Sequence, residues 1–398
     1  MKERPSWIIY PGDCRVVMGC RADETVDAVV TDPPYGLEFM GKDWDRALPD
    51  PEVWRQALRV LKPGGHLMAF GAPRLYHRMA CHIEDAGFEL RDCLMWMFGS
   101  GFPKSLDVSK AIDGLHGAER EVVGISAGGF AGGTGQHAGQ GGSYNYRLTH
   151  DKTIPATDDA KRWQGWGTAL KPAYEPIILA RKPLRGTVAA NVLEHGTGAI
   201  NVDGCRVEGE KTETRHTRKA DGAGAGWHPV PTGDVTEHSG RWPANVLHDG
   251  SPEVLRLFPG SGGDSPARFF YCAKASTSER EAGMEGEDQE WVDPTREEGS
   301  AGRDNPRAGA GRQGQRANAH PTVKPLDLMR WCVRLVTPPG GLVLDPFAGS
   351  GTTICAAVLE NRNAIGIELS EDYCRIARQR VESWENSDQA RQGDLFGA

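Results

Sequence analysis

Residues 341–353 read GLVLDPFAGSGTT, an apolar run that ends in Asp345 and leads into a turn with two glycines. The pattern predicts a strand, a tight turn at Gly349 and Gly351, and a helix after the turn. Glycine allows the backbone to approach a ligand where a Cβ atom would clash. Ile354 stands where the dinucleotide pattern GxGxxG has its third glycine, so the turn predicts a nucleoside site without support for a pyrophosphate.

The segment that follows strengthens this interpretation. A predicted strand over 364–368 ends in Glu368, close to the spacing at which an acidic side chain meets ribose hydroxyls. One helix, 371–384, follows, so the sheet lacks a strand that residues 7–10 (WIIY) can supply. The two ends of the chain are then neighbours in a circularly permuted fold, with Asp13 near the base of the nucleoside. From its Pro-Gly-Asp context alone, Asp13 is an ordinary turn residue.

The rest of the chain alternates strands and helices. Strands are predicted at 26–31, 66–70, 88–98 and 174–180, and helices at 51–61, 73–86, 325–336 and 351–360. Such alternation is typical of a parallel sheet with helices on both faces. The sequence therefore predicts an α/β fold, interrupted by a glycine-rich stretch at 124–142 and an irregular one at 186–318.

A second motif, Asp32-Pro33-Pro34-Tyr35, follows the predicted strand 26–31. Its carboxylate and the Pro33 carbonyl can accept two hydrogen bonds from an amino group on a flat base, which is a poor nucleophile until it is oriented. The prolines restrict the backbone and so fix both acceptors, and the Tyr35 ring offers a face for stacking. The alternative is that the prolines end the strand and Tyr35 is buried filler. The position at the end of a parallel strand favours a binding site.

Composition limits the class of protein. With 398 residues, 38% of them hydrophobic, the chain can bury a large core. It has no apolar run long enough to cross a membrane, and its start lacks the apolar stretch of a signal peptide. The nine cysteines occur singly, so we expect a cytoplasmic protein without a metal site. The net charge of −8 does not exclude nucleic acid, because binding depends on local patches such as the arginines between 303 and 316.

Taken together, the motifs resemble those of the beta group of DNA amino-methyltransferases, in which the catalytic motif precedes the target-recognition region and the cofactor motif follows it. Further matching segments are Gly12-Asp13, KPGG at 62–65, KPAYEPII at 171–178 and HPTVKP at 320–325. The resemblance implies a Rossmann-like class I methyltransferase sheet of seven strands with an antiparallel last strand. It also implies S-adenosyl-L-methionine as cofactor and double-stranded DNA as substrate, with the target base flipped out of the helix.

The resemblance makes Asp32, Pro33, Pro34 and Tyr35 the catalytic residues. Asp32 favours adenine N6 as the target, because members of the group with serine at this position methylate cytosine N4. The pair of acceptors suits either amine, so cytosine N4 stays the alternative within the enzyme class. A noncatalytic DNA-binding partner subunit is the alternative from another class, and the intact acceptors and glycine turn disfavour it.

Cofactor contacts are also implied by the resemblance. Thr322 and Lys324 should lie beside the methionine part of the cofactor, while Glu368 binds the ribose hydroxyls and Asp13 the adenine. The full implied set is Asp13, Cys14, Asp32, Thr322, Lys324, Asp345, Phe347, Ala348, Gly349, Ser350, Gly351, Thr352, Glu368 and Leu369.

The same motifs suggest a division of the chain. We expect a catalytic half over 1–103, a glycine-rich insertion over 104–167, a core strand over 168–185, a target-recognition region over 186–318, a cofactor-binding half over 319–385 and a tail over 386–398. The recognition region follows by elimination and is expected to be partly disordered near 279–318. Candidate DNA contacts are Phe39, Trp44, Arg206, Arg215 and Arg241. A homodimer is compatible with the sequence, which does not determine the oligomeric state.

Overall fold

The computed structural model describes most of the chain, in stretches separated by gaps. The described residues are 4–37, 45–99, 101, 105–127, 149–207, 212–219, 229–260, 265–272, 279, 281–284, 290–291, 315–316, 318, 320 and 323–387. The chain divides into two compact units, of which one comprises 1–99, 174–290 and 316–398 and the other 100–173 and 291–315.

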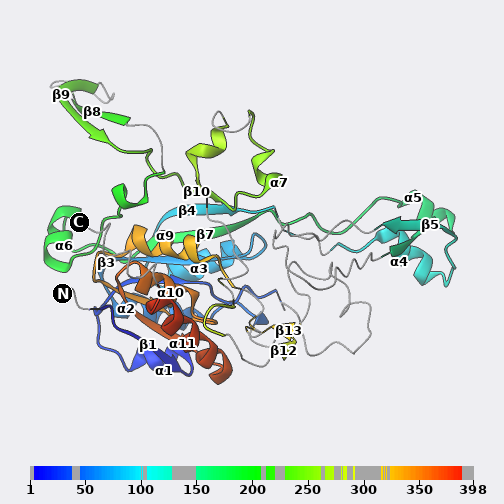
Figure 1. Ribbon diagram of the computed structural model, residues 1–398, viewed down its shortest axis with the longest axis horizontal. Helices are drawn as coiled ribbons and strands as arrows, with labels where there is room; N and C mark the ends of the chain where they lie inside the picture. The colour runs from blue at the N-terminus through cyan, green and yellow to red at the C-terminus, as the bar shows by residue number, and fades with distance from the viewer. Residues whose placement is uncertain are drawn as a thin grey trace, which may run out of the picture. The chain divides into compact units, whose positions relative to one another are not determined.

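The first unit is built on a nine-stranded sheet with the order β1-β15-β14-β2-β3-β7-β4-β10-β11. Figure 1 labels β1, β3, β7, β4 and β10 of this sheet. Its strands are β1 (Trp7–Pro11), β15 (Asn363–Glu368), β14 (Leu342–Asp345), β2 (Val26–Thr31), β3 (Leu61–Phe70), β7 (Tyr174–Arg181), β4 (Glu89–Met97), β10 (Val246–His248) and β11 (Tyr271–Cys272). Neighbouring strands run parallel except where β7 pairs with β3 and β4. The predicted α/β sheet with one antiparallel strand is therefore confirmed.

The first and the last strand of the chain lie side by side. In the parallel pair of β1 and β15, Trp7 stands opposite Ala364. Just before β1, the backbone N–H and the hydroxyl of Ser6 donate to Oδ1 of Asn363 at 2.8 and 2.9 Å. The prediction that residues 7–10 complete the sheet beside 364–368 is confirmed, and the strand order is circularly permuted.

The expectation of seven strands is wrong, because β10 and β11 extend the sheet beyond β4. Both come from the stretch that the sequence left irregular, and they run parallel to β4. They pair with backbone groups that would otherwise stand unpaired at the edge of the sheet. Strands of three and two residues are too short to produce a recognisable alternation of apolar and polar side chains.

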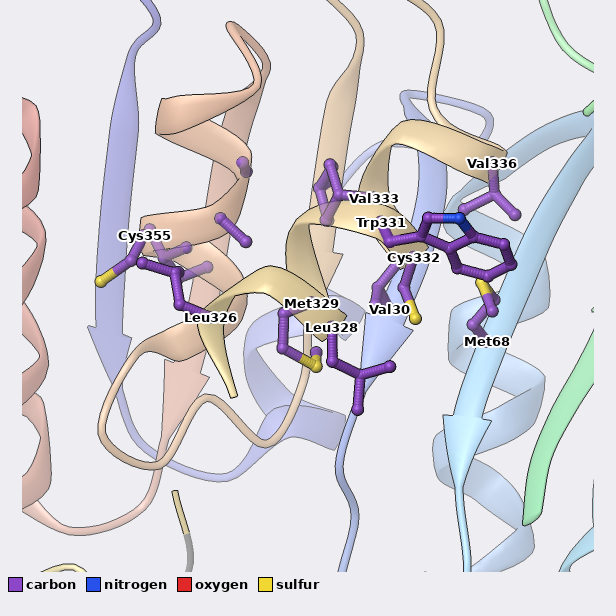
Figure 2. Close-up of a cluster of buried hydrophobic side chains, with 14 of the residues drawn as sticks. Val30, Met68, Leu326, Leu328, Met329, Trp331, Cys332, Val333, Val336 and Cys355 are labelled. Carbon is purple, nitrogen blue, oxygen red and sulfur yellow. The ribbon is translucent and has the colours of Figure 1, made fainter. Parts of the chain in front are cut away.

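Helices cover both faces of the sheet. The cluster on one face includes residues of α9 (Leu326–Val336), α10 (Thr352–Leu359) and α11 (Glu371–Glu385), whereas the cluster on the other includes α1 (Cys14–Gly19), α2 (Pro51–Val60) and α3 (Tyr76–Asp85). Figure 2 shows part of the first cluster, where buried Trp331 of α9 lies near Met68 of β3. Each large apolar side chain that is fully buried contributes roughly 1.5–3 kcal/mol.

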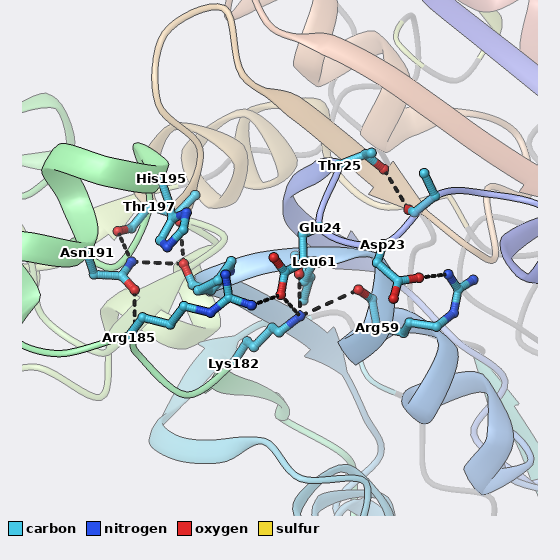
Figure 3. A network of polar contacts seen from close by, with 12 residues as sticks. Asp23, Glu24, Thr25, Arg59, Leu61, Lys182, Arg185, Asn191, His195 and Thr197 are labelled. Carbon is cyan, nitrogen blue, oxygen red and sulfur yellow. Dashed lines mark hydrogen bonds and ion pairs between the residues drawn. The ribbon is translucent and has the colours of Figure 1, made fainter.

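The KPGG segment at 62–65 lies at the start of β3, directly after α2 (Pro51–Val60). The Pro63 carbonyl accepts hydrogen bonds from Asn191 Nδ2 at 2.9 Å and Thr197 Oγ1 at 2.6 Å (Figure 3). Gly64 has a φ of +75°, and a Cβ on it would lie 2.5 Å from the Asn191 amide. The segment therefore joins β3 to α6 (Val188–His195) and its following turn.

The second unit contains α4 (Val108–Leu115), a hairpin of β5 (Val122–Ala127) and β6 (Thr149–Thr153), and α5 (Asp158–Arg162). The buried Asp113 carboxylate accepts hydrogen bonds from the Arg120 guanidinium at 2.7 Å and the Thr157 hydroxyl at 2.8 Å. Burial raises the pKa of Asp113, but these bonds and those from backbone N–H groups prevail and lower it to about 2. The stretch expected as a glycine-rich loop thus carries regular elements in its described parts, while 128–148 lies outside them.

Shorter elements complete the description. They are η3 (Asp203–Cys205), a hairpin of β8 (Thr212–Lys219) and β9 (Pro229–His238), α7 (Pro252–Leu255), η5 (Pro266–Phe269), and the pair β12 (Glu290–Trp291) and β13 (Gln315–Arg316). Most of the stretch expected to be disordered lies outside the described residues. Within the described part of the chain, no helix has both the length and the apolar character needed to span a membrane.

Candidate active site

Acidic side chains gather at one edge of the sheet of the first unit. Parallel strands end at the same edge, so β15, β14 and β2 bring Glu368, Asp345 and Asp32 to it. Strand β7 runs the other way, and its first residues pair with the last residues of β3 and with the end of β4. This places Glu175 at the same edge, so that four strands of the sheet supply a carboxylate there.

Asp32 lies at the centre of a small polar cluster. The Lys324 ammonium contacts Asp32 Oδ2 at 2.8 Å and Glu175 Oε2 at 3.1 Å. The Tyr35 hydroxyl donates to Asp32 Oδ1 at 2.6 Å and lies 3.0 Å from Lys324 Nζ. Each carboxylate oxygen has two lone pairs, so Asp32 keeps room to accept hydrogen bonds from a ligand.

The protonation states in this cluster follow from burial and charge. Burial lowers the pKa of Lys324, but Asp32 and Glu175 outweigh it and raise that pKa, so the side chain is an ammonium. Burial, reinforced by Asp32 and opposed by Lys324, raises the pKa of Glu175. Burial and the two carboxylates also raise the pKa of Tyr35, whose hydroxyl keeps its proton. The cluster thus contains one fixed cation between two carboxyl groups.

The loop that carries the 32–35 motif is held by a buried carboxylate, Asp45. Its Oδ1 accepts the backbone N–H of Tyr35 at 2.6 Å and that of Gly36 at 3.0 Å, and its Oδ2 accepts the N–H of Leu37 at 3.3 Å. Three consecutive N–H groups on one carboxylate fix the course of the backbone after the prolines. Sequence inspection missed Asp45, because nothing in the local pattern distinguishes it from a turn residue.

Asp345 connects the motif at 32–35 to the glycine turn. Its Oδ1 accepts a hydrogen bond from the Thr31 hydroxyl at 2.6 Å and from the Phe347 N–H at 3.0 Å. Burial raises the pKa of Asp345 to about 6, although the hydrogen bonds from Thr31, Thr353 and Phe347 oppose this shift. Asp32 and Asp345 are 313 positions apart in the sequence. The hydrogen bond from Thr31 to Asp345 brings the two motifs together in the folded chain.

The glycine turn has the backbone geometry that a close ligand requires. Gly349 and Gly351 have φ values of +52° and +79°, which side-chain-bearing residues rarely adopt. A Cβ on Gly349 would lie 2.7 Å from His320 Nε2, and a Cβ on Gly351 would lie 2.9 Å from Ala377 Cβ. The absence of a Cβ on Gly349 therefore lets His320 approach the turn closely, and the centroid of the His320 ring lies 4.6 Å from that of Tyr373.

Glu368 stands beside this turn in a suitable position to bind hydroxyl groups. Its Oε2 accepts the Gly349 N–H at 2.8 Å and its Oε1 accepts the Ser370 N–H at 2.9 Å. Burial raises the pKa of Glu368 against the effect of these hydrogen bonds. A further hydrogen bond comes from the Leu369 N–H. Three of the four lone pairs of the carboxylate are then used, and the fourth is left for a hydroxyl such as one of a ribose.

Asp13 and Cys14 follow β1 at the same edge, where the Gly12 N–H donates to the Glu368 carbonyl at 2.9 Å. The Asp13 side chain caps α1 by accepting the Arg15 N–H at 2.8 Å. Its hydrogen bonds with Arg15 lower the pKa of Asp13 against a smaller effect of burial. Burial raises the pKa of the Cys14 thiol to about 12, so it stays neutral and is a poor nucleophile.

The back of the glycine turn is held by Arg380, which is fully buried. Its guanidinium donates to the Ser350 carbonyl at 2.5 Å and to the side-chain oxygens of Ser350 and Thr352 at 3.0 and 3.1 Å. It also donates to the Glu279 carbonyl at 3.1 Å. The sequence suggested Ser350 and Thr352 as cofactor contacts, and the structure shows that both side chains contact Arg380.

The remaining predicted residues differ in where they lie. Ala348 is buried, Phe347 packs against a core cluster, and Leu369 is 71% exposed beside Glu368. The Arg206 side chain is 8% exposed and pairs with Asp203 at 2.7 Å. Arg241 exchanges backbone hydrogen bonds with Val207, and Arg215 belongs to β8. Three predicted residues lie outside the described ones, namely Thr322, Phe39 and Trp44.

Sequence inspection also missed Glu175 as a member of the site, although its segment was recognised as a strand. The direction of that strand is the feature that could have placed Glu175 in the site. In an antiparallel strand the amino end, rather than the carboxyl end, reaches the edge where the parallel strands finish. Arg380 gave no signal, because helix surfaces often carry arginine.

The arrangement can bind two kinds of group. Asp32 and the neighbouring backbone can accept hydrogen bonds from an amino group, and Glu368 with the glycine turn can hold a nucleoside. Among the described residues, no group of three or more His, Cys, Asp or Glu side chains is arranged to hold a metal ion. The residues of the site can position a bound group and stabilise developing positive charge with a carboxylate.

Comparison with known proteins shows which family the chain belongs to. A family model described as DNA methylase, for N6 and N4 methyltransferases, matches residues 26–379. The type II methyltransferase M.HindIII of Haemophilus influenzae is 24% identical over 334 residues, which are 83% of this chain and 67% of the relative. The DNA adenine methyltransferase YhdJ of Escherichia coli is 41% identical over 63 residues, 16% of this chain and 21% of the relative.

The matches to other curated relatives are short. In two of them the chain spans 27% and 22% of the relative's own length. Among solved structures, the cytosine-N4-specific PvuII DNA methyltransferase aligns with 98% of this chain and 95% of its own. The identity is 14% and the TM-score 0.43.

Proposed function

Since the chain belongs to the family of DNA methylases that its match over residues 26–379 identifies, we propose that it is a sequence-specific methyltransferase of double-stranded DNA. The methyl group passes from S-adenosyl-L-methionine to the N6 amino group of an adenine that has been flipped out of the helix. One observation carries the proposal above all. Thr31, the residue before Asp32, donates a hydrogen bond of 2.6 Å to Asp345, which precedes the glycine turn at 349–351.

The cofactor fits the residues present. Glu368 offers a free lone pair to a ribose hydroxyl, and the positive φ values of Gly349 and Gly351 let the backbone lie against the nucleoside. Asp13, at the end of β1, lies at the edge where the adenine of the cofactor is held. When bound, S-adenosyl-L-methionine supplies an electrophilic methyl group on a sulfonium centre.

The protein orients the target amine. Asp32 and the Pro33 carbonyl accept the two N–H groups of the adenine amine, which aligns its nitrogen with the methyl group. The negative charge of Asp32 stabilises the positive charge that develops on this nitrogen during transfer. The Tyr35 hydroxyl holds Asp32 in place by its bond of 2.6 Å, and the Tyr35 ring is the proposed stacking surface.

Adenine is the proposed base because Asp32 opens the motif, as it does in the N6 members of the group that the chain resembles. The cytosine-N4 reaction is chemically open to the same acceptors, so the product must be identified directly. DNA from cells that express the protein should be digested to nucleosides. N6-methyladenine is expected among the nucleosides, and N4-methylcytosine without N6-methyladenine would contradict the choice of base.

The role of Asp32 is tested by the substitution Asp32→Ala. We expect methyl transfer to fall about 100-fold or more, whereas cofactor binding and thermal unfolding stay close to those of the wild type. The fold should survive, because Lys324 keeps its ion pair with Glu175 at 3.1 Å. Unchanged turnover in this variant would show that Asp32 is not the catalytic carboxylate.

A further inference from the structure

Glu175 is a partly buried titratable group, with 22% of its side chain exposed, to which the proposed function assigns no role. It stands at the second position of β7, whose antiparallel direction brings it to the edge where β2 ends. On the neighbouring β3 side, the Gly71 N–H donates to the Pro176 carbonyl at 2.9 Å. The backbone around Glu175 is therefore fixed by the sheet, and the position of its carboxylate does not depend on a mobile loop.

Glu175 and Asp32 share one cation. Lys324 Nζ is 2.8 Å from Asp32 and 3.1 Å from Glu175. The Tyr35 hydroxyl lies between the two carboxylates, at 2.6 Å from Asp32 and 3.4 Å from Glu175. The four groups come from three separate segments, so a hydrogen-bonded cluster of this composition requires the complete fold.

The charges of this cluster do not cancel when both carboxyl groups are ionised. Two carboxylates and one ammonium leave one excess negative charge, and a buried excess charge is costly. The cost is reduced when a proton binds to Glu175, in agreement with its raised pKa. It is also reduced when positive charge develops on a bound amine, which makes the charge excess favourable in the transition state of methyl transfer.

We propose that Glu175 is a positioning residue for methyl transfer, because in its ionised form it shares Lys324 with Asp32. Lys324 then neutralises Asp32 only in part, and Asp32 remains a strong acceptor for the target amine. When Glu175 is protonated, Lys324 pairs with Asp32 alone and weakens it as an acceptor. The inference rests on the proposed function and adds to it a residue that acts through Lys324, without contact to the target base.

The groups that face Glu175 determine how pH acts on it. They are Asp32 and Tyr35 from the loop after β2 and Lys324 from the segment before α9. Asp345 is close enough to Asp32 for the charge of Asp32 to affect it, and its pKa is also raised. Substitutions must therefore show which of these groups causes a pH dependence. Because the pKa of Glu175 is raised, its ionised fraction and the methyl transfer rate should increase with pH above the range of an ordinary glutamate.

The test is the single-turnover rate of methyl transfer to a DNA that the wild type methylates, measured from about pH 5 to about pH 9. Glu175→Gln keeps an acceptor for Lys324 but not the charge. It should lower the rate at neutral pH by about tenfold or more, and the rise of the rate with pH should disappear. The dissociation constant of S-adenosyl-L-methionine should change little, since Glu175 acts on Asp32.

Two further variants make the result decisive. Glu175→Asp should restore part of the rate and the rise with pH, because it restores the charge. Glu89→Gln is the matched control, since Glu89 lies on the adjacent strand β4 and pairs with Arg181 away from Asp32. It should behave as the wild type in rate, pH profile and cofactor binding.

Three outcomes overturn the inference. If Glu175→Gln keeps the wild-type rate, the shared ion pair is not needed. If the rise with pH persists in this variant, another group such as Asp345 produces it. If cofactor binding or thermal stability falls as much as the rate, Glu175 supports the cofactor or the fold instead. A wild type that methylates no DNA would refute the proposed function itself, and this result is distinguishable from the other three.

Discussion

Asp345 shows how one residue can link stability to the organisation of the site. It is nearly completely buried, and yet it is a carboxyl group between the two motifs, bonded to Thr31 and Phe347. Its pKa of about 6 is well above the ordinary value of 3.8. The folded protein therefore retains a proton on Asp345 at pH values where the unfolded chain has lost it.

This shift predicts a pH-dependent loss of stability. Between the unfolded pKa and about pH 6, the free energy of unfolding should fall as the pH rises, because the folded state binds more protons than the unfolded state. Above about pH 6 the Asp345 carboxyl group is ionised in the folded protein as well, and its burial as a charge then lowers the free energy of unfolding by about 3 kcal/mol. Asp345→Asn should remove this cost while keeping an acceptor oxygen for Thr31.

Urea unfolding at about pH 5 and about pH 7.5 measures the difference. The free energy of unfolding of the variant, minus that of the wild type, should be about 1–2 kcal/mol larger at the higher pH than at the lower one. All other titrating groups are common to both proteins, so they cancel in the comparison. If the free energies of unfolding of the two proteins change equally with pH, Asp345 does not bind a proton in the folded state in this range.

At the scale of elements, the turn between β14 and α10 depends on two different properties of glycine. Gly351 has a positive φ and also packs against α11, since a Cβ would lie 2.9 Å from Ala377 Cβ. Gly340 has a similar φ of +72°, but no atom lies within 4 Å of the place of its Cβ. The two positions therefore separate the backbone effect from the packing effect.

We expect Gly340→Ala to cost about 1–2 kcal/mol through its backbone conformation alone. Gly351→Ala should cost roughly 1–3 kcal/mol more, because α11 must move, and it should weaken cofactor binding. Thermal unfolding and titration with S-adenosyl-L-methionine check both variants. Equal stability and equal cofactor affinity of the two variants would mean that the turn tolerates the displacement of α11.

Elements also explain which parts of the site could be predicted from sequence. The pattern of a strand that ends in an acidic residue and then turns is local, and it locates the ends of β14 and β15 at one edge. Asp45 and Glu175 act through contacts with Tyr35 and Lys324 that only the folded chain brings about. Glu175 was also hard to recognise because β7 runs antiparallel to its neighbours. The strand β11 could not be predicted because it has only two residues.

At the scale of the whole molecule, the longer segment of the second unit, 100–173, is inserted at a single point of the sheet. Met97, the last residue of β4, pairs with Tyr174, the first residue of β7. The chain therefore leaves the first unit and returns to it at neighbouring positions. The sheet needs only a short connection at this point, as in an antiparallel hairpin.

We predict that residues 100–172 can be replaced by a short turn of glycine and asparagine without loss of the first unit. The shortened protein should unfold cooperatively and bind S-adenosyl-L-methionine with an affinity close to that of the full chain, since the residues proposed to bind the cofactor belong to the first unit. Calorimetry checks both properties. Absence of a cooperative transition would show that the second unit is needed for folding of the first.

The pairing of β1 with β15 has a consequence for synthesis of the protein. Ser6 meets Asn363 across 357 positions of sequence, so the nascent chain carries Asp32 long before it carries the glycine turn. Contacts of such separation form late, because the intervening chain must be available first. A polypeptide still on the ribosome therefore carries Asp32 and its loop without the glycine turn at 349–351, and the proposed site is complete only after the last part of the chain has been made.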